Sequence, residues 1–411
     1  MTTRRLQPTD TIVVGGGPVG SYTALNLSKL GVKTTVFEEH PQIGLPSHCA
    51  GHISIHSLKA MGLYPLPRGI IENNFSTANF YSPAGSKFSL HLSCPVTTAL
   101  NRARFDQYLA KLAEEAGAEF VLGSRVQSLI IKEGYVKGVN VINSDSNQQI
   151  NSKIVIDTEG ISSRLLRQTG LTPLKPSGIV YAIETEMENV ENVDLDAVEV
   201  YFGKSYAPGF YGWVIPRPDG SAKVGLATNH GNPREYLKRL MTKHPVASKQ
   251  LAKAKITSTG YHAITLAGPI PQSYMNGFLA AGDCASQVKS TTGGGVIFGL
   301  KAAKEAAEVT RKALKAGDVS SRVLSEYQKR CDALFKFDTK EMLKLRQFID
   351  SLSDERLDEM LRVCGKLGVA DALRDVNEID FQGKMLLNAA TKPAMIAALG
   401  YFSLLYLSAN P

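Results

Sequence analysis

Residues 11–39 read TIVVGGGPVGSYTALNLSKLGVKTTVFEE, and this stretch decides the fold. The β-branched run at residues 12–14 predicts a short strand, and Gly15, Gly17 and Gly20 then give the G-x-G-x-x-G spacing at the turn into a helix. Such glycines permit a tight turn, let the backbone approach a pyrophosphate, and let the helix pack closely on the strand. The free N–H groups at the helix N-terminus would face the phosphates.

An acidic pair follows the second strand predicted in this stretch, residues 33–37. Glu38 and Glu39 stand where a carboxylate accepts a hydrogen bond from the ribose 2′-hydroxyl of a dinucleotide, and Glu38 fits the strand end better. An acid at this point favours FAD or NAD over NADP. The strand, the helix and the acid together make the glycine motif specific. The sequence therefore predicts an adenine-dinucleotide site.

Length and charge set wider limits. The chain has 411 residues, enough for two or three compact units, and carries 46 Lys and Arg against 38 Asp and Glu, a net charge of +8. A positive net charge favours binding to anionic lipid headgroups, phosphorylated substrates or an acidic partner. It is equally expected if the proteins of the source organism are basic in general. The basic residues are scattered, which disfavours nucleic acid as a partner. Five widely spaced cysteines without a CxxC pattern predict no metal site, and the polar residues 1–10 predict no signal peptide.

A loop rich in Pro, Gly and His holds one of these cysteines. Cys49 and Gly51 form a C-x-G, and His48 and His52 flank it. A cysteine beside two histidines could be a reactive thiol near a flavin. A small buried residue lining the cofactor explains the same pattern equally well.

Two later stretches also carry information. In PGFYGWVIP, residues 208–216, the side chains of Tyr211, Trp213 and Ile215 alternate on one face of a predicted strand, which is either core or the wall of a pocket. In residues 277–300 a strand ends at Gly282-Asp283, and an acid there can bond a ribose or the ribityl chain. The run from Thr291 to Gly295 then exposes successive N–H groups before a helix that we expect to begin near Val296.

The last hundred residues are predicted to be mostly helical. They end in PAMIAALGYFSLLYLS, an apolar run from residue 393 that is shorter than the roughly 20 residues of a spanning helix. The run is either a helix packed on the protein or a monotopic anchor in a membrane face.

These motifs together resemble the FAD-dependent para-hydroxybenzoate hydroxylase superfamily. The resemblance rests on the opening glycines with Glu38, on Arg102 before FDQYLA, on the turn Glu159-Gly160 before Ser162, and on Gly282-Asp283. Three further features are similar to those of the geranylgeranyl reductase family. They are the Cys49-x-Gly51 loop, the motif Pro208-x-x-Tyr211-x-Trp213-x-Ile215-Pro216, and the glycine run after Asp283.

The resemblance implies an α/β fold. It comprises a Rossmann-like FAD-binding domain, an antiparallel β-sheet substrate domain of the para-hydroxybenzoate hydroxylase type, and a C-terminal helical region. The implied boundaries are 1–60, 95–170 and 260–315 for the FAD-binding domain, 61–94 and 171–259 for the substrate domain, and 316–411 for the helical region.

The resemblance also implies an oxidoreductase that saturates isoprenoid C=C bonds of geranylgeranyl chains, those of archaeal-type ether lipids, with FAD as cofactor. An external donor would supply electrons: NAD(P)H, ferredoxin or a deazaflavin. Carried over by motif, the cofactor-binding residues are Gly15, Gly17, Pro18, Gly20, Glu38, Glu39, Cys49, Ala50, Gly51, Arg102, Gly282, Asp283, Gly293, Gly294, Gly295 and Val296. Tyr211 and Trp213 would wall the prenyl pocket. Two departures from the family pattern are Ile215 in place of Phe, and Glu159-Gly160 in place of Asp-Gly.

An unactivated alkene has no carbonyl to polarise, so its reduction needs a hydride together with a proton. A dry cavity, aromatic faces and a proton donor would serve this chemistry. The candidate donors are Cys49, His48, His52 and Tyr211, and Cys49 is preferred because an ordinary thiol is protonated at neutral pH.

Two other classes of function compete with the reductase: a flavin monooxygenase or halogenase acting on a small aromatic, and a non-catalytic flavoprotein. The expected location is cytoplasmic, with peripheral contact on the membrane face left open.

Overall fold

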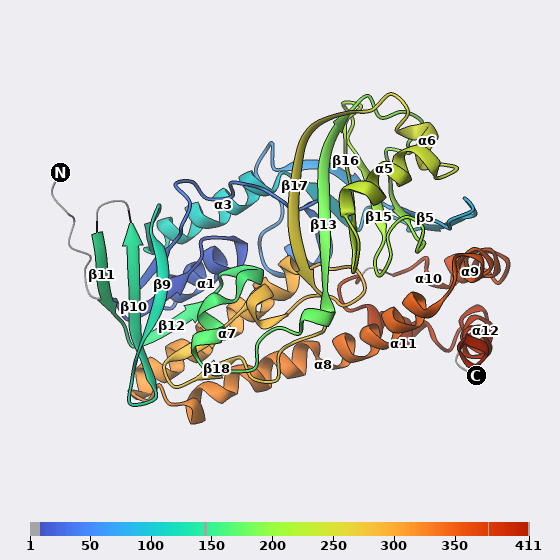
Figure 1. Ribbon diagram of the computed structural model, residues 1–411. Coiled ribbons are helices and arrows are strands. Elements are labelled where there is room, and N and C mark those ends of the chain that lie inside the picture. Colours follow the sequence, from blue (N-terminus) through green and yellow to red (C-terminus); the bar gives the residue numbers. More distant parts are fainter. Residues whose placement is uncertain (1–8, 144–145, 377, 410–411) are drawn as a thin grey trace. The chain divides into compact units, whose positions relative to one another are not determined.

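The computed structural model describes residues 9–143, 146–376 and 378–409 (Figure 1). The chain forms two compact units, each built from three separate segments. The first unit takes residues 1–47, 102–176 and 267–339, and the second takes residues 48–101, 177–266 and 340–411. Helix α8 (Ser321–Ser351) contributes to both.

A six-stranded sheet forms the centre of the first unit. Its order is β18 (Tyr274–Met275), β19 (Phe278–Ala280), β12 (Ile154–Asp157), β1 (Thr11–Val14), β2 (Thr34–Phe37) and β8 (Glu119–Val121). All neighbours are parallel except β18 and β19. Each of β1, β2, β12 and β19 is buried along its length, as expected for a parallel sheet covered on both faces. The predicted opening strand–helix–strand unit is confirmed.

Helices α1 (Pro18–Lys29), α3 (Arg102–Glu115) and α7 (Val296–Ala316) pack together in this unit. Small residues allow the close approach. A Cβ added at Gly20 would lie 1.9 Å from the Gly15 carbonyl oxygen, and one added at Gly299 would lie 2.4 Å from the Val19 side chain. Gly20 therefore has the packing role that the motif predicts, and α7 begins at Val296 as expected.

Short elements and a small sheet complete the first unit. Strands β9 (Arg125–Lys132), β10 (Tyr135–Asn143) and β11 (Ser146–Asn151) form an antiparallel sheet, labelled in Figure 1. The short helices are η1 (Gly160–Ser162), α4 (Arg164–Gln168) and η3 (Gly282–Ala285). A further turn, η2 (Pro176–Gly178), stands before β13.

A seven-stranded sheet forms the centre of the second unit. Its order is β17 (Lys255–Thr265), β13 (Ile179–Glu188), β16 (Ala222–Thr228), β15 (Gly212–Pro216), β14 (Ala197–Tyr201), β5 (Thr77–Tyr81) and β6 (Lys87–His91). One face carries an apolar cluster that includes Trp213 and Ile215. The other face packs against α5 (Pro233–Lys243) and α6 (Ala247–Gln250).

The structure corrects one helix boundary. Residues 233–254 are predicted from the sequence to be helical, but α5 ends at Lys243 and α6 spans only residues 247–250. His244 has extended backbone angles because Pro245 follows it, and the residue before a proline is disfavoured in the α region.

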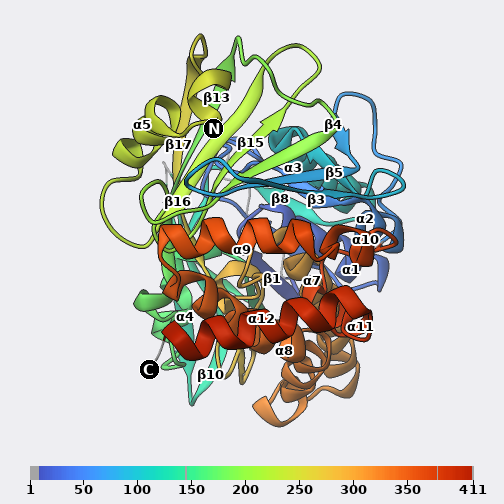
Figure 2. The ribbon, with the colours of Figure 1, turned by 90° about the vertical axis from the view of Figure 1, so that its right-hand side faces the viewer.

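A small sheet of β3 (His52–Ser54), β7 (Thr97–Leu100) and β4 (Ile71–Phe75), with helix α2 (Ile55–Ala60), also belongs to the second unit. So do α9 (Asp354–Lys366), α10 (Val369–Leu373), α11 (Gln382–Ala389) and α12 (Pro393–Ala409), drawn in red in Figure 2. Buried side chains of α9, α10 and α12 form one apolar cluster with the end of α8. Within the described ranges, no helix is long and apolar enough to cross a membrane.

Candidate functional site

The glycine turn of the first unit has one side against protein and one side open. Gly15 has a φ of 96°, and a Cβ there would lie 2.7 Å from the Thr158 carbonyl oxygen. At Gly17, the residue before α1, an added Cβ would meet no protein atom within 4 Å. A pyrophosphate approaching the N-terminus of α1 needs open space at this point, and Pro18 opens the helix without losing a needed donor. The turn therefore fits the dinucleotide that the motif predicts.

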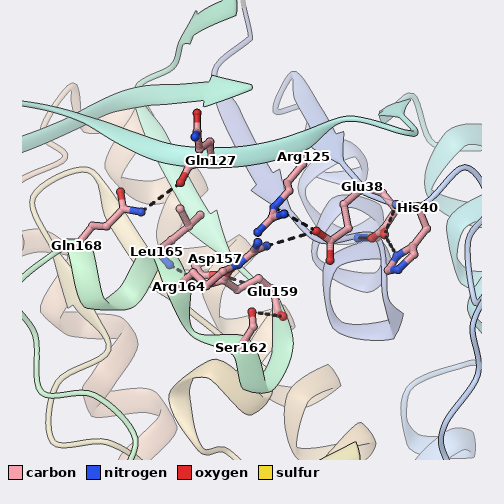
Figure 3. Close-up of polar contacts among 12 residues, drawn as sticks. Glu38, His40, Arg125, Gln127, Asp157, Glu159, Ser162, Arg164, Leu165 and Gln168 are labelled. Carbon is pink, nitrogen blue, oxygen red and sulfur yellow. Dashed lines mark hydrogen bonds and ion pairs between the residues drawn. The ribbon is translucent and has the colours of Figure 1, made fainter. Parts of the chain in front are cut away.

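Glu38 lies beside this turn at the end of β2, as Figure 3 shows. Its Oε2 accepts a hydrogen bond from the Gly16 N–H at 2.7 Å, and its Oε1 accepts one from the His40 N–H at 2.9 Å. The carboxylate is thus fixed in place by backbone donors next to the glycine turn. The position suits the predicted ribose contact.

Glu39 lies in a different environment. It is half-exposed and pairs with Arg125 and Arg164, each at 3.5 Å. Glu159, from the turn that departs from the family pattern, accepts the Leu165 N–H at 2.7 Å and pairs with Arg164 at 3.3 Å. Its carboxylate therefore holds the start of α4.

Arg102 and Asp283 interact electrostatically within the first unit. Arg102, at the start of α3, pairs with Asp106 one turn later at 3.2 Å, and both side chains are nearly buried. Burial raises the pKa of the Asp283 carboxyl, and the positive charge of Arg102 opposes that rise. One nearly buried arginine thus lies near two carboxyls.

In the second glycine run, residues 291–295, not every backbone N–H group is exposed for a ligand. The Gly293 N–H closes a turn on the Lys289 carbonyl at 2.9 Å, so this group is used within the loop. A Cβ at Gly295 would lie 2.6 Å from Asp283 Oδ1, and one at Gly294 would lie 2.6 Å from the Lys289 side chain. Gly282 has a φ of 83°. These glycines bring the start of α7, at Val296, next to Asp283.

The Cys49 loop belongs to the second unit. Cys49 is half-buried and free, and Gly51 has a φ of 69°. Lys223 donates to the Ala50 carbonyl at 3.1 Å and so fixes the middle of the loop. The two flanking histidines differ: His52 is exposed and packs edge-on against Phe75, whereas Nδ1 of His48 is buried.

The aromatic stretch builds an apolar face in the same unit. Tyr211 lies one residue before β15 and stacks on Phe210 with ring centroids 4.2 Å apart. Trp213 is buried and meets Tyr211 edge-on at 6.0 Å. Both belong to the cluster that also holds Ile215, so the predicted alternation on one face is confirmed.

Sequence reasoning missed two buried charged residues near these aromatic rings. Glu184 on β13 accepts the Trp213 Nε1–H at 2.8 Å. Lys223 on β16 pairs with Glu72 at 2.7 Å. The available signal was an ionisable residue within a strand that otherwise reads as buried, since such residues are almost never fully buried unless paired.

Comparison with known proteins now identifies the family. The model of the FAD binding domain family matches residues 8–336. Digeranylgeranylglycerophospholipid reductase 2 of Methanothermobacter thermautotrophicus is 34% identical over 359 residues, covering 86% of this chain and 91% of that protein. Digeranylgeranylglycerophospholipid reductase of Methanocaldococcus jannaschii is 32% identical, covering 87% and 90%. The chain belongs to the geranylgeranyl reductase family.

Solved structures agree with this membership. A geranylgeranyl bacteriochlorophyll reductase-like protein from Thermoplasma acidophilum matches with a TM-score of 0.86 and 27% identity, over 96% of this chain and 99% of that one. The flavin-dependent brominase Bmp2 matches with a TM-score of 0.71 at 18% identity, over 89% and 93%, and so shares the fold alone. The cofactor of this geranylgeranyl reductase family member is FAD, and the fold class that the resemblance implied is confirmed.

Proposed function

We propose that this protein is an FAD-dependent reductase that saturates C=C bonds in the geranylgeranyl chains of archaeal-type ether phospholipids. The observation that carries the proposal is the match, over about nine-tenths of both chains, to relatives named digeranylgeranylglycerophospholipid reductase. The apolar face of Tyr211 and Trp213 supports it, because a prenyl chain has no polar group to bind. The same face supports our proposal that β5, β6 and β13–β17 belong to a substrate-binding domain.

Residues of the first unit would hold the cofactor. Bound FAD supplies the hydride for the reduction. The open side of Gly17 and the N-terminus of α1 would receive the pyrophosphate together with Arg102. Glu38 would accept from the ribose, Asp283 would contact the ribityl chain, and the loop ending at Gly295 would line the ring system.

Cys49 is the proton donor in this proposal. Burial raises the pKa of the Tyr211 hydroxyl, so this tyrosine holds its proton too tightly to give it up readily. His52 is exposed, where water competes for any proton that it transfers. Cys49 is half-buried on a loop fixed by Lys223, and this position favours it over both.

Helix α12 supports peripheral membrane contact as part of the proposal. Its Met395, Ala398 and Leu405 are buried in the C-terminal apolar cluster, whereas Ile396, Leu399 and Leu404 are 58%, 48% and 69% exposed. One face is thus packed and another presents large apolar side chains, as a helix lying in a membrane surface does. Residues 406–408 of the predicted apolar run lie beyond the side chains that the structure describes.

An anaerobic single-turnover experiment tests the reductase. The purified protein with bound FAD is photoreduced and mixed with a geranylgeranyl phospholipid, and flavin reoxidation is followed together with product mass. We expect a gain of two hydrogens per turnover, slowed at least tenfold in C49A, which corresponds to about 1.4 kcal/mol of barrier. Cys94 is an exposed cysteine of the same unit, so C94A is the matched control and should behave as wild type. Unchanged lipid with fully reduced flavin would contradict the proposal, and rapid reaction with oxygen and an aromatic would favour a monooxygenase.

A further inference from the structure

A row of four residues crosses the seven-stranded sheet of the second unit. Gly260 on β17 lies opposite Glu184 on β13, Glu184 lies opposite Gly225 on β16, and Gly225 lies opposite Trp213 on β15. Strands β17 and β13 are the two long neighbours at the upper right of Figure 1. Directly opposed residues of antiparallel strands place their side chains on the same face. Glu184 is therefore the only ionisable residue among these four, and the other three are Gly260, Gly225 and Trp213.

Each glycine of this row leaves space that a ring fills. A Cβ added at Gly225 would lie 2.5 Å from Cζ2 of Trp213, and one added at Gly260 would lie 2.7 Å from Nδ1 of His48. The indole and the imidazole therefore lie against the sheet on opposite sides of Glu184. The indole donates its Nε1–H to Oε2 of Glu184 at 2.8 Å.

The other carboxyl oxygen and the imidazole nitrogen have no such bond. Among the residues that the structure describes, Oε1 of Glu184 and Nδ1 of His48 are both buried and have no hydrogen-bond partner. Opposed Cβ atoms in a sheet are about 4.5–5.5 Å apart, and Nδ1 of His48 stands close to where the Cβ of Gly260 would be. The two atoms thus belong to the same part of this sheet face, where one water molecule could bridge them, since buried waters typically join such polar atoms.

We propose that Glu184, through one bridging water and His48, returns to the Cys49 thiol the proton that each reduction consumes. The inference rests on the proposed reductase activity with Cys49 as donor. It adds two residues to that activity, neither of which need touch the substrate. Glu184 is the proton reservoir, His48 is the relay, and Trp213 orients the carboxyl.

The charges around Glu184 suit a reservoir. Burial raises the pKa of the Glu184 carboxyl to about 8, and the negative charge of Glu186 adds to this rise. The positive charge of Lys223, the hydrogen bond from Trp213 and, more weakly, the charge of Arg217 oppose it. His262, opposite Ala182 on the same face of the sheet, and Glu72, which pairs with both Lys223 and Arg217, are further titratable groups nearby. The carboxyl thus holds a proton at neutral pH, and its anion would be stabilised by a cation and an N–H donor.

The proton steps balance as follows. Saturation of one double bond forms two C–H bonds, one from the hydride and one from the proton of the Cys49 thiol, which becomes a thiolate. His48 gives the proton on Nε2 to that thiolate while Nδ1 takes one from the bridging water. The water takes the proton of Oε1, so Glu184 becomes a carboxylate. A solvent proton then binds Nε2 of His48, and the Nδ1 proton passes back through the water to Glu184, which restores both groups for the next reduction.

Trp213 allows a test that does not depend on activity. It is the only tryptophan of the chain, so its fluorescence reports on Glu184 alone among the buried carboxyls. In the holoenzyme we expect a fluorescence change with a midpoint near pH 8, absent in E184Q. Glu199 is the matched control, because it is buried on the opposite face and bonds Tyr201 at 2.6 Å. E199Q should keep the transition, and its presence in E184Q would overturn the proposal.

Turnover kinetics supply the second readout. At pH 7 under continuous anaerobic photoreduction, E184Q should complete the first reduction at the wild-type rate, because the thiol starts protonated, and should slow later reductions at least tenfold. G260A, which displaces His48 and changes no ionisable group, should do the same. Equal rates for wild type, E184Q and G260A in all turnovers would refute the relay. If wild type itself forms no reduced lipid in the first turnover, the proposed function has failed instead.

Discussion

At the scale of single residues, two glycines of the first turn are expected to have different roles, one in cofactor binding and the other in helix packing. Gly17 and Gly20 stand three positions apart, yet an added Cβ meets open space at the first and lies 1.9 Å from the Gly15 carbonyl oxygen at the second. We expect G17A to fold with nearly unchanged thermal stability without FAD but to bind FAD at least tenfold more weakly, because its methyl group enters the space of the pyrophosphate. Flavin titration followed by fluorescence, together with melting of the apoprotein, measures both effects.

G20A is the control for this prediction. It should lower the melting temperature of the apoprotein itself, since α1 must move away from β1. Wild-type FAD affinity in a well-folded G17A would show that the open side of the turn is not the phosphate site.

At the scale of elements, one buried lysine links the large sheet of the second unit to its small one. Lys223 on β16 donates to the Leu100 carbonyl at the end of β7 at 2.7 Å and to the Ala50 carbonyl before β3, and it pairs with Glu72 on β4. We expect K223M to cost about 1–3 kcal/mol of unfolding free energy, because it leaves the Leu100 and Ala50 carbonyls without their donor, whereas Glu72 keeps its ion pair with Arg217 at 3.2 Å. Urea unfolding measures the loss.

The same substitution should release the Cys49 loop, so Cys49 in K223M should react faster with a thiol reagent. K253M removes an exposed lysine paired with Glu191 and should cost no more than about 1 kcal/mol. If K223M were as stable as K253M, this lysine would not be what joins the two sheets.

At the scale of the whole molecule, the C-terminal helix and the net charge of +8 bear on membrane contact. We expect the triple substitution I396S/L399S/L404S to keep the fold, because these side chains are exposed, and to lower binding to anionic lipid vesicles at least fivefold in co-sedimentation. Deleting α12 is a poorer test, because Met395, Ala398 and Leu405 belong to the apolar cluster. A matched substitution of exposed Leu387 on α11 shows whether the effect is specific to α12, and unchanged sedimentation would contradict membrane contact through this face.

Structural features that depend on neighbouring residues could be predicted from the sequence, whereas those that depend on the pairing of distant strands could not. The strand–turn–helix at residues 11–29, the start of α7 and the shared face of Trp213 and Ile215 follow from neighbouring residues, and the structure has them as expected. The row around Glu184 could not be predicted, because it places opposite one another residues that are 12 to 76 positions apart and depends on register. The helix break at His244 was predictable, since Pro245 signals it.

The interleaving of the two units has a consequence for synthesis on the ribosome. Strand β1 pairs with β12, and β12 pairs with β19, so the sheet of the first unit is completed only when residues 278–280 have emerged. At about 5–20 residues per second the sheet waits on the order of half a minute after β1 for its last strand. The nascent chain therefore exposes apolar strand edges during most of translation. Chaperone protection would matter most for the segments between β1 and β19.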